Sequence, residues 1–203
     1  MSLTEERRTR KAEQSEATRS ALLAVARELF AERGYAGVGT EEIVQRARVT
    51  RGALYHHFRD KKDLFRAVHE QLEAELAATL SKQLAEGPAH DPIALLRTGV
   101  RTFLDHCMNP ALARIALVDA PSVLGWEEWR EVDEKYGLGL VMAGLQGAMA
   151  AGAIREQPVK PLAHLILGAL GEAGMLIANA DDPMAAREEV EPPLLGLLEG
   201  LRT

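Results

Sequence analysis

The sequence contains a single cysteine, Cys107, among its 203 residues. One thiol excludes an intramolecular disulfide framework and a multi-thiolate zinc site within one chain. The segment Met1–Lys11 also lacks the apolar run of a secretory signal peptide. We therefore expect a protein of the reducing cytoplasm whose stability depends on an apolar core.

Aromatic residues are scarce as well, at 4% of the chain, whereas apolar residues make up 47%. Alanine, leucine, valine and glycine therefore have to fill the interior, and a composition rich in Ala and Leu favours helices over sheets. No segment alternates polar and apolar residues for long enough to indicate a strand. Composition and periodicity together predict an all-α fold of about nine helices.

Long uncharged runs are rare. Only Gly137–Ile154, with 18 uncharged residues, reaches the lower limit for a membrane-spanning helix. Five glycines and five alanines make this segment weakly hydrophobic. We expect it to be a closely packed helix of a globular protein, and we expect no membrane partner.

The chain has 24 basic and 30 acidic residues, a net charge of −6, and these charges are unevenly distributed. Residues 1–66 hold 14 basic and 10 acidic residues, a net of +4, so residues 67–203 hold the other 10 and 20, a net of −10. Such asymmetry indicates a module that faces nucleic acid or a membrane, joined to an acidic one.

The pattern of helix signals predicts three regions: a flexible arm of mixed charge over residues 1–18, a compact head over 19–66 and a larger body over 67–203. The head is expected to contain a helix over residues 19–33 and two short helices capped by Thr40 and Thr50. Asp60 is expected to cap a longer helix that follows them.

Two short helices joined by a turn of three or four residues can form a helix-turn-helix, whose second helix lies in the major groove of DNA. The same pattern also fits an ordinary helical hairpin with solvated basic side chains, which is common in all-α proteins. The residues alone leave both interpretations open.

The segment Thr40–Val68, TEEIVQRARVTRGALYHHFRDKKDLFRAV, resembles the DNA-binding signature of the TetR family of transcriptional repressors. The matching positions are Thr40, Ile43, Ala47, Val49, Gly52, Leu54, Tyr55, His57, Phe58, Lys61 and Leu64. Upstream, Ala21–Tyr35 resembles the first helix of that family and the Gly-Tyr turn after it. The resemblance implies a three-helix DNA-binding domain, a larger helical domain for effector binding and dimerisation, and a homodimer on a palindromic operator.

The resemblance also implies roles for individual side chains. Phosphate contacts are implied for Thr40, Tyr55, His57 and Lys61, and contacts to base edges for Thr50, Arg51, Gly52, Ala53 and His56. Arg51 is the first candidate for a specific contact, because a guanidinium group can pair with O6 and N7 of guanine. Lys62 stands beside Lys61 at the start of the next helix, where its charge can also meet phosphate.

The acidic body is expected to bind a small, mostly apolar organic effector that releases the DNA. Trp126 and Trp129 share one face of a helix and either wall this site or belong to the core. Glu172 interrupts an apolar helix, so it is either a buried group at the effector or dimer site or part of an exposed strip. The other effector candidates are Phe103, His106, Met142, Met175 and Asn179.

The last two long helices are implied by the resemblance to form the dimer interface. The candidate interface residues are Gly168, Gly171, Gly174, Leu194 and Leu198. The sequence departs from the family pattern at Pro192-Pro193, which should break or kink the last helix.

Two other classes of function remain as alternatives. An enzyme is disfavoured because no P-loop, nucleophile elbow, zinc-protease motif or dinucleotide-binding glycine pattern is present, and we expect neither a metal ion nor another cofactor. A helical protein-interaction adaptor would use the same Gly- and Ala-rich faces without binding DNA.

Overall fold

The structure, a computed structural model, describes residues 3–86 and 91–203. All of the regular elements in these ranges are helices, as the sequence predicts, and one isolated antiparallel bridge pairs Ile154 with Arg202. The chain divides into two compact units, Met1–His69 and Glu70–Thr203. Each unit is therefore described by itself.

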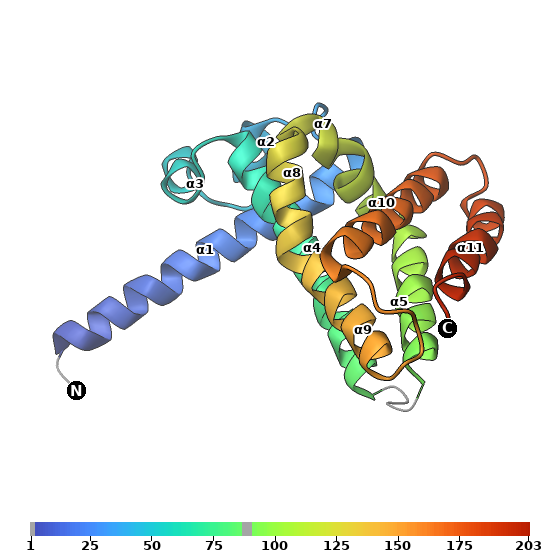
Figure 1. The fold of residues 1–203 in the computed structure, drawn as a ribbon. Coiled ribbons are helices and arrows are strands. Elements are labelled where there is room, and N and C mark those ends of the chain that lie inside the picture. Colours follow the sequence, from blue (N-terminus) through green and yellow to red (C-terminus); the bar gives the residue numbers. More distant parts are fainter. Residues whose placement is uncertain (1–2, 87–90) are drawn as a thin grey trace. The chain divides into compact units, whose positions relative to one another are not determined.

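The first unit consists of α1 (Leu3–Arg33), α2 (Thr40–Arg46), α3 (Arg51–His57) and the beginning of α4 (Lys61–Glu86). Figure 1 shows α2 and α3 beside α1, and both contact it. Phe30 and Phe65 are fully buried and meet edge to face, with 5.2 Å between their ring centroids. Tyr35 joins them, with its ring centroid 5.2 Å from that of Phe65. Several aliphatic side chains of the head are also completely buried, among them Leu22, Leu29, Ile43 and Leu54.

Two local expectations for the head differ from the structure. The segment 1–18 is helical from Leu3 onward, where the sequence analysis expects a flexible arm, and residues 1–2 lie outside the described residues. Its Arg, Lys, Glu, Gln and Ala residues are strong helix formers, which favours continuation of α1. The N-cap of α2 is Gly39 and not Thr40, whose hydroxyl instead contacts the Glu41 carboxylate at 3.3 Å.

The second unit is built from the remainder of α4 and the helices that follow it. These are α5 (Pro92–Cys107), α6 (Pro110–Ala113), α7 (Ala120–Leu124), α8 (Trp126–Asp133), α9 (Gly139–Ala150), α10 (Val159–Ala178) and α11 (Pro183–Glu199). Two π-helical segments, η1 (Arg114–Asp119) and η2 (Glu134–Leu138), join neighbouring α-helices. Asp91 caps α5 by accepting a hydrogen bond from the Ala94 amide at 2.9 Å.

Helices α5, α10 and α11 pack against one another around a shared core (Figure 1). This core contains Val100, Leu104, Cys107, Leu170, Ala173, Ile177, Leu194 and Leu198. A second core lies between α9, α10 and the start of α5, around Ile93, Leu145 and Ala163. The interior of this unit is thus made of aliphatic side chains, as the low aromatic content requires.

Of the break or kink predicted at Pro192-Pro193, the break does not occur, because α11 runs without interruption from Pro183 to Glu199. The two prolines leave the carbonyl groups of Glu188 and Glu189 without their helical N–H donors. Both glutamates are exposed, so water can satisfy these carbonyls. Burial of Leu194 and Leu198 immediately after the prolines fixes the C-terminal half of α11 against the core.

Among the described residues, α10 is the one helix long and apolar enough to cross a membrane by length and composition. It contributes to both cores of the second unit through Ala163, Leu170, Ala173 and Ile177. Gly137–Ile154, the uncharged run noted above, is divided between η2, α9 and the turn after α9. Helix α9 has 12 residues, so it spans about 18 Å, which is shorter than the hydrocarbon core of a bilayer.

Gly174 allows α10 to approach α5 and η1 closely. A Cβ atom at this position would lie 2.9 Å from Cδ1 of Leu117, 3.1 Å from Sγ of Cys107 and 3.4 Å from Cζ of Phe103. We expect Gly174→Val to lower the free energy of unfolding by about 1–3 kcal/mol, since a close-packed interior has no room for the added carbons. Urea denaturation at fixed protein concentration measures this loss.

Gly147→Val is the matched control, because nothing lies within 4 Å of a Cβ atom at Gly147 on the exposed side of α9. Its effect should stay within about 0.5 kcal/mol. Equal stability of the two variants would contradict the close packing at Gly174.

Candidate functional site

The two short helices of the head are joined by a tight turn. Arg48 in this turn has a φ of 54°, and the Val49 amide donates a hydrogen bond to the Val44 carbonyl at 3.0 Å. Thr50 caps α3, because its hydroxyl oxygen accepts a hydrogen bond from the Ala53 amide at 3.1 Å. The α2–turn–α3 segment is therefore a helix-turn-helix, with Ile43 and Leu54 holding its two helices to the core.

Helix α3 presents a distinct outer surface. Arg51, Gly52, Tyr55 and His56 are exposed, whereas Leu54 is completely buried. The structure therefore brings together, on one side of a short helix, most of the side chains for which the sequence analysis expects contacts to bases. Ala53 and His57 are half-buried beside this surface, and Thr50 is exposed at the start of the helix.

Arg51 is positioned by two neighbours within the head. Its Nη1 atom lies 3.0 Å from Oε1 of Glu41, and its guanidinium carbon lies 5.5 Å from the centroid of the Tyr55 ring. The side chains of Arg51 and Glu41 are 67% and 72% exposed, so water screens this ion pair. Exposed pairs of this kind contribute about 0.2–1 kcal/mol, which leaves Arg51 free to exchange Glu41 for another acceptor.

Lys61 has a structural role that the sequence analysis does not anticipate. Its Nζ atom donates hydrogen bonds to the carbonyl oxygens of Tyr35 and Val38, each at 2.9 Å. The same atom lies 4.0 Å from the centroid of the Tyr35 ring. The ammonium group thus fixes the 35–38 turn that leads into α2, and one of its three N–H donors remains for other acceptors.

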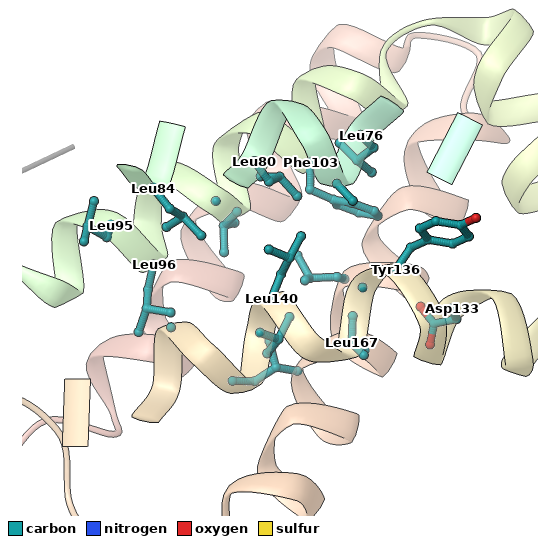
Figure 2. A pocket seen from close by; sticks show the side chains of 18 of the residues that line it. Leu76, Leu80, Leu84, Leu95, Leu96, Phe103, Asp133, Tyr136, Leu140 and Leu167 are labelled. Atoms are coloured by element: carbon teal, nitrogen blue, oxygen red, sulfur yellow. The ribbon is translucent and has the colours of Figure 1, made fainter. Parts of the chain in front are cut away.

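The second unit contains a cavity of about 110 Å³. Its walls come from α4, α5, α8, η2, α9, α10 and α11 and are mostly aliphatic. Leu76, Leu80, Leu84, Leu140 and Leu167 are among the residues that line it. Figure 2 shows two aromatic residues, Phe103 and Tyr136, among the side chains that line it. An apolar lining with a few polar groups is typical of a site for a small organic molecule.

Two carboxyl groups, Glu73 from α4 and Asp133 from α8, also line the cavity. Burial and, to a smaller extent, the nearby charge of Asp133 together raise the pKa of Glu73 to about 7. The pKa of Asp133 is also raised, mainly by burial, although Arg130 and His164 oppose this shift. The pKa shifts of both carboxyl groups therefore favour their neutral forms relative to exposed carboxyl groups.

The effector candidates from the sequence mostly lie elsewhere. Phe103 lines the cavity, but the other seven do not. Trp126 is 66% exposed, and its ring contacts that of Trp129 at 5.5 Å between centroids. Glu172, Met175 and Asn179 are exposed on α10, so Glu172 belongs to an exposed strip. His106 and Met142 are half-buried without lining this cavity.

Glu73, Asp133 and Tyr136 line the cavity but were not predicted as effector residues, although the sequence holds a signal for Glu73. Glu73 lies on the same helical stripe as Leu76, Leu80 and Leu84, all of which line the cavity. A carboxylate that continues an apolar stripe is an unusual feature. This feature does not identify a cavity residue by itself, because Glu172 also interrupts an apolar helix and is exposed.

Comparison with known proteins identifies the family. Residues 93–201 match the family model described as tetracyclin repressor-like, C-terminal domain, and residues 22–68 match the model for bacterial regulatory proteins of the tetR family. The first of these matches alone covers more than half of the chain. The chain belongs to the TetR family of transcriptional regulators. It is therefore a DNA-binding regulator of transcription.

Individual relatives agree with this assignment to the TetR family. The transposon Tn10 TetC protein of Escherichia coli is 30% identical over 140 residues, which are 68% of each chain. The HTH-type transcriptional regulator AcrR of Shigella flexneri is 38% identical over 85 residues, which are 42% of this chain and 39% of AcrR. The crystal structure of a TetR-family regulator from Pectobacterium atrosepticum has a TM-score of 0.82 and 35% identity, and the match covers 94% of this chain and 96% of that one.

The five residues expected at the dimer interface occupy two kinds of position, some packed inside the protomer and some open on α10. Leu194 and Leu198 are buried in the core that α11 shares with α5 and α10. Gly174 packs closely against the same core, with no space for a side chain. Within one protomer these three positions therefore pack against the protomer's own core, and their place at the dimer interface stays a prediction. Nothing lies within 4 Å of a Cβ atom at Gly168 or Gly171, so both remain open on α10.

The two hydrogen bonds of Lys61 lead to a prediction about the stability of the head. We expect Lys61→Met to lower the stability of the head by about 1–3 kcal/mol, because two charge-assisted hydrogen bonds to backbone carbonyls are lost. Amide hydrogen exchange in residues 34–40 should become faster. Lys82→Met, which removes an exposed lysine from the same helix, should leave that exchange unchanged. Unchanged exchange in both variants would contradict the structural role of Lys61.

Proposed function

We propose that this chain is a ligand-responsive repressor that binds a palindromic operator as a homodimer and leaves it when a small organic molecule enters the cavity of the second unit. The observation that carries the proposal is the exposed face of α3, with Arg51 at its N-terminal end and Tyr55 and His56 along it. A short helix with a basic, hydrogen-bonding outer face fits the recognition helix of a helix-turn-helix.

Arg51 is proposed as the main base-reading residue. Its pairing with Glu41 and its contact with Tyr55 hold the guanidinium group at the outer surface and limit the rotamer entropy lost on binding. A bidentate contact with guanine is worth about 1–3 kcal/mol, which exceeds the contribution of an exposed ion pair. DNA can therefore displace Glu41 from Arg51.

The surrounding side chains are proposed to bind the phosphate backbone and the groove edges. Gly52 has no close neighbour other than Thr50, so the backbone of α3 can approach DNA closely. The phosphate contacts proposed are those of Thr40, Tyr55, His57, Lys61 and Lys62, and the base-edge contacts are those of Thr50, Arg51, Gly52, Ala53 and His56. For Lys61, the contact would use the N–H donor that the 35–38 turn leaves unused.

Helix α4 is proposed as the element that couples effector binding to DNA release. It begins with Lys61 in the first unit and continues through Glu73 and Leu84, which line the cavity of the second. An effector can release DNA only by preferring a conformation in which the two heads of a dimer no longer match successive major grooves. A continuous helix that bears on both sites can shift with the conformation that the effector selects.

The dimer interface is proposed to be the outer face of α10 and α11. Leu165, Met175 and Leu176 of α10 and Leu197 of α11 are exposed apolar side chains, and Gly168 and Gly171 lie on the same helix without close neighbours. Glu172 and Asn179 are exposed among the apolar residues of α10. Small residues beside exposed apolar ones allow two helices from different protomers to approach closely.

The base-reading role predicts a change in specificity. Arg51→Ala should weaken binding to the preferred operator by about ten- to a hundredfold while leaving non-specific binding nearly unchanged. The operator is first selected from a random duplex library, and affinities for it and for a scrambled duplex are then compared by fluorescence anisotropy at several salt concentrations.

Arg46→Ala is the matched control, because it removes the same charge from the neighbouring helix. It should affect both duplexes equally. If Arg51→Ala also weakened both duplexes by the same factor, base reading by Arg51 would be excluded. If no duplex were preferred by the unchanged protein, the repressor proposal itself would fail.

The dimer proposal predicts that Leu176→Glu produces monomers, because it places a carboxylate in an apolar contact. Sedimentation velocity should show the loss of the dimer, and affinity for the operator should fall by at least tenfold because two heads no longer bind together. Val118→Glu introduces the same group at another exposed apolar position and should remain dimeric. A dimeric Leu176→Glu variant would exclude this face of α10.

A further inference from the structure

Glu41, in α2, is an acidic residue on the surface through which the head is proposed to bind DNA. Its carboxylate accepts hydrogen bonds from two of the proposed DNA contacts. Oε1 lies 3.0 Å from Nη1 of Arg51, the proposed base-reading residue, and Oε2 lies 3.3 Å from the hydroxyl of Thr40, a proposed phosphate contact. The side chain of Glu41 is 72% exposed. A negative group is therefore placed between a phosphate contact and a base contact.

Glu42, the next residue of α2, has a different environment. Its carboxylate pairs with Arg33 of α1 and with Arg46 of α2. Consecutive residues of an α-helix point about 100° apart, so the two glutamates face different neighbours. Glu42 joins α2 to α1, whereas Glu41 contacts side chains of the DNA-binding surface.

The proposed DNA contacts take both partners away from the Glu41 carboxylate. Arg51 exchanges Glu41 for guanine, and the hydroxyl of Thr40 turns to a phosphate. A carboxylate that loses its water in an interface and receives no hydrogen bond is costly, and the phosphates of DNA repel its charge. Glu41 therefore requires an N–H donor from the DNA itself.

The distance between Glu41 and Arg51 limits where this donor lies. The Oε1 atom is 3.0 Å from Nη1 of Arg51, and consecutive base pairs of DNA are about 3.4 Å apart along the helix axis. When the guanidinium group of Arg51 lies on a guanine, the carboxylate of Glu41 is therefore within reach of the neighbouring base pair.

The major groove presents one base edge that suits a carboxylate, which is an acceptor only. Cytosine offers its N4 amino group as a donor with no acceptor beside it. Adenine places the N7 acceptor next to its N6 amino group, guanine presents two acceptors, and thymine presents an acceptor and a methyl group. Lone pairs of these acceptors repel the carboxylate, so cytosine is the base that Glu41 matches.

We propose that Glu41 is a second base-reading residue, which accepts a hydrogen bond from the N4 amino group of a cytosine in a base pair next to the guanine that Arg51 contacts. The inference rests on the proposed function, because it takes Arg51 as the main base-reading residue. In the DNA-free protein the Arg51–Glu41 pair holds both side chains at the outer surface, so both reach the groove already ordered. A wrong base leaves the carboxylate facing an acceptor, so Glu41 also acts against other sequences.

The first part of the test uses the full-length protein and the operator selected from a random duplex library. The guanine that Arg51 contacts is the one whose preference disappears in Arg51→Ala. A base pair next to it should contain a preferred cytosine. Replacement of this base pair by each of the other three should weaken binding about fivefold or more, measured by fluorescence anisotropy at fixed salt concentration.

Glu41→Gln changes the hydrogen-bonding pattern of the side chain and keeps its shape. An amide has both a donor and an acceptor, which match N7 and N6 of adenine. The duplex with adenine at the cytosine position should therefore bind this variant about fivefold more tightly than the original operator. The guanine preference should remain. Glu41→Ala should remove the preference at the cytosine position without creating a new one.

Glu42→Gln is the matched control, because it makes the same substitution at the neighbouring residue, whose partners are Arg33 and Arg46. It should leave the base preference unchanged at every operator position, even if it lowers the stability of the head. Thermal unfolding followed by circular dichroism shows that each variant is folded at the temperature of the titrations.

Three results would overturn the role of Glu41: no preferred cytosine beside the guanine, a cytosine preference that persists in Glu41→Gln, or a Glu41→Gln variant whose affinity changes by one factor for all four base pairs. A selected operator with an Arg51-dependent guanine, found together with any of these results, would leave the repressor function standing. Absence of any preferred duplex would reject the proposed function and this inference together.

Discussion

One helix, α4, contributes residues both to the core of the head and to the wall of the cavity in the second unit. Its single sequence has to meet the packing requirements of both. At its beginning, Lys61 fixes the 35–38 turn, and Phe65 completes the aromatic core of the head. Further along, Glu73 and Leu84 form opposite ends of the cavity wall. The sequence of α4 therefore has to complete the core of the head at its beginning and the wall of the cavity further along.

The head meets DNA with charges that are partly engaged inside the protein. Arg51 pairs with Glu41, Arg33 and Arg46 pair with Glu42, and Lys61 holds two backbone carbonyls. The net charge of +4 over residues 1–66 therefore overstates the charge available to phosphates. Exposed ion pairs are weak, so a side chain such as Arg51 can exchange its partner while the fold remains intact.

Much of the head could be predicted because its signals are local. Thr50 caps α3, Asp60 accepts a hydrogen bond from the Asp63 amide at 2.8 Å, and Asp91 caps α5, each as the sequence indicates. The family resemblance of Thr40–Val68 is confirmed by the family models. The helical segment 3–18 and the uninterrupted α11 were not predicted, because helix propensity and packing outweighed the charge pattern and the two prolines.

The sequence by itself determined the helices, the boundary signals and the DNA-binding family, since these follow from spacing within about one or two helical turns. Only the tertiary structure decided which polar residues are buried. Glu73 and Glu172 both lie among apolar residues of a helix, yet Glu73 borders the cavity and Glu172 faces outward. Likewise Leu194 and Leu198 pack inside their own protomer, while Leu165 and Leu176 remain exposed. Helical periodicity groups residues on a face, but the element that covers this face comes from a distant part of the chain.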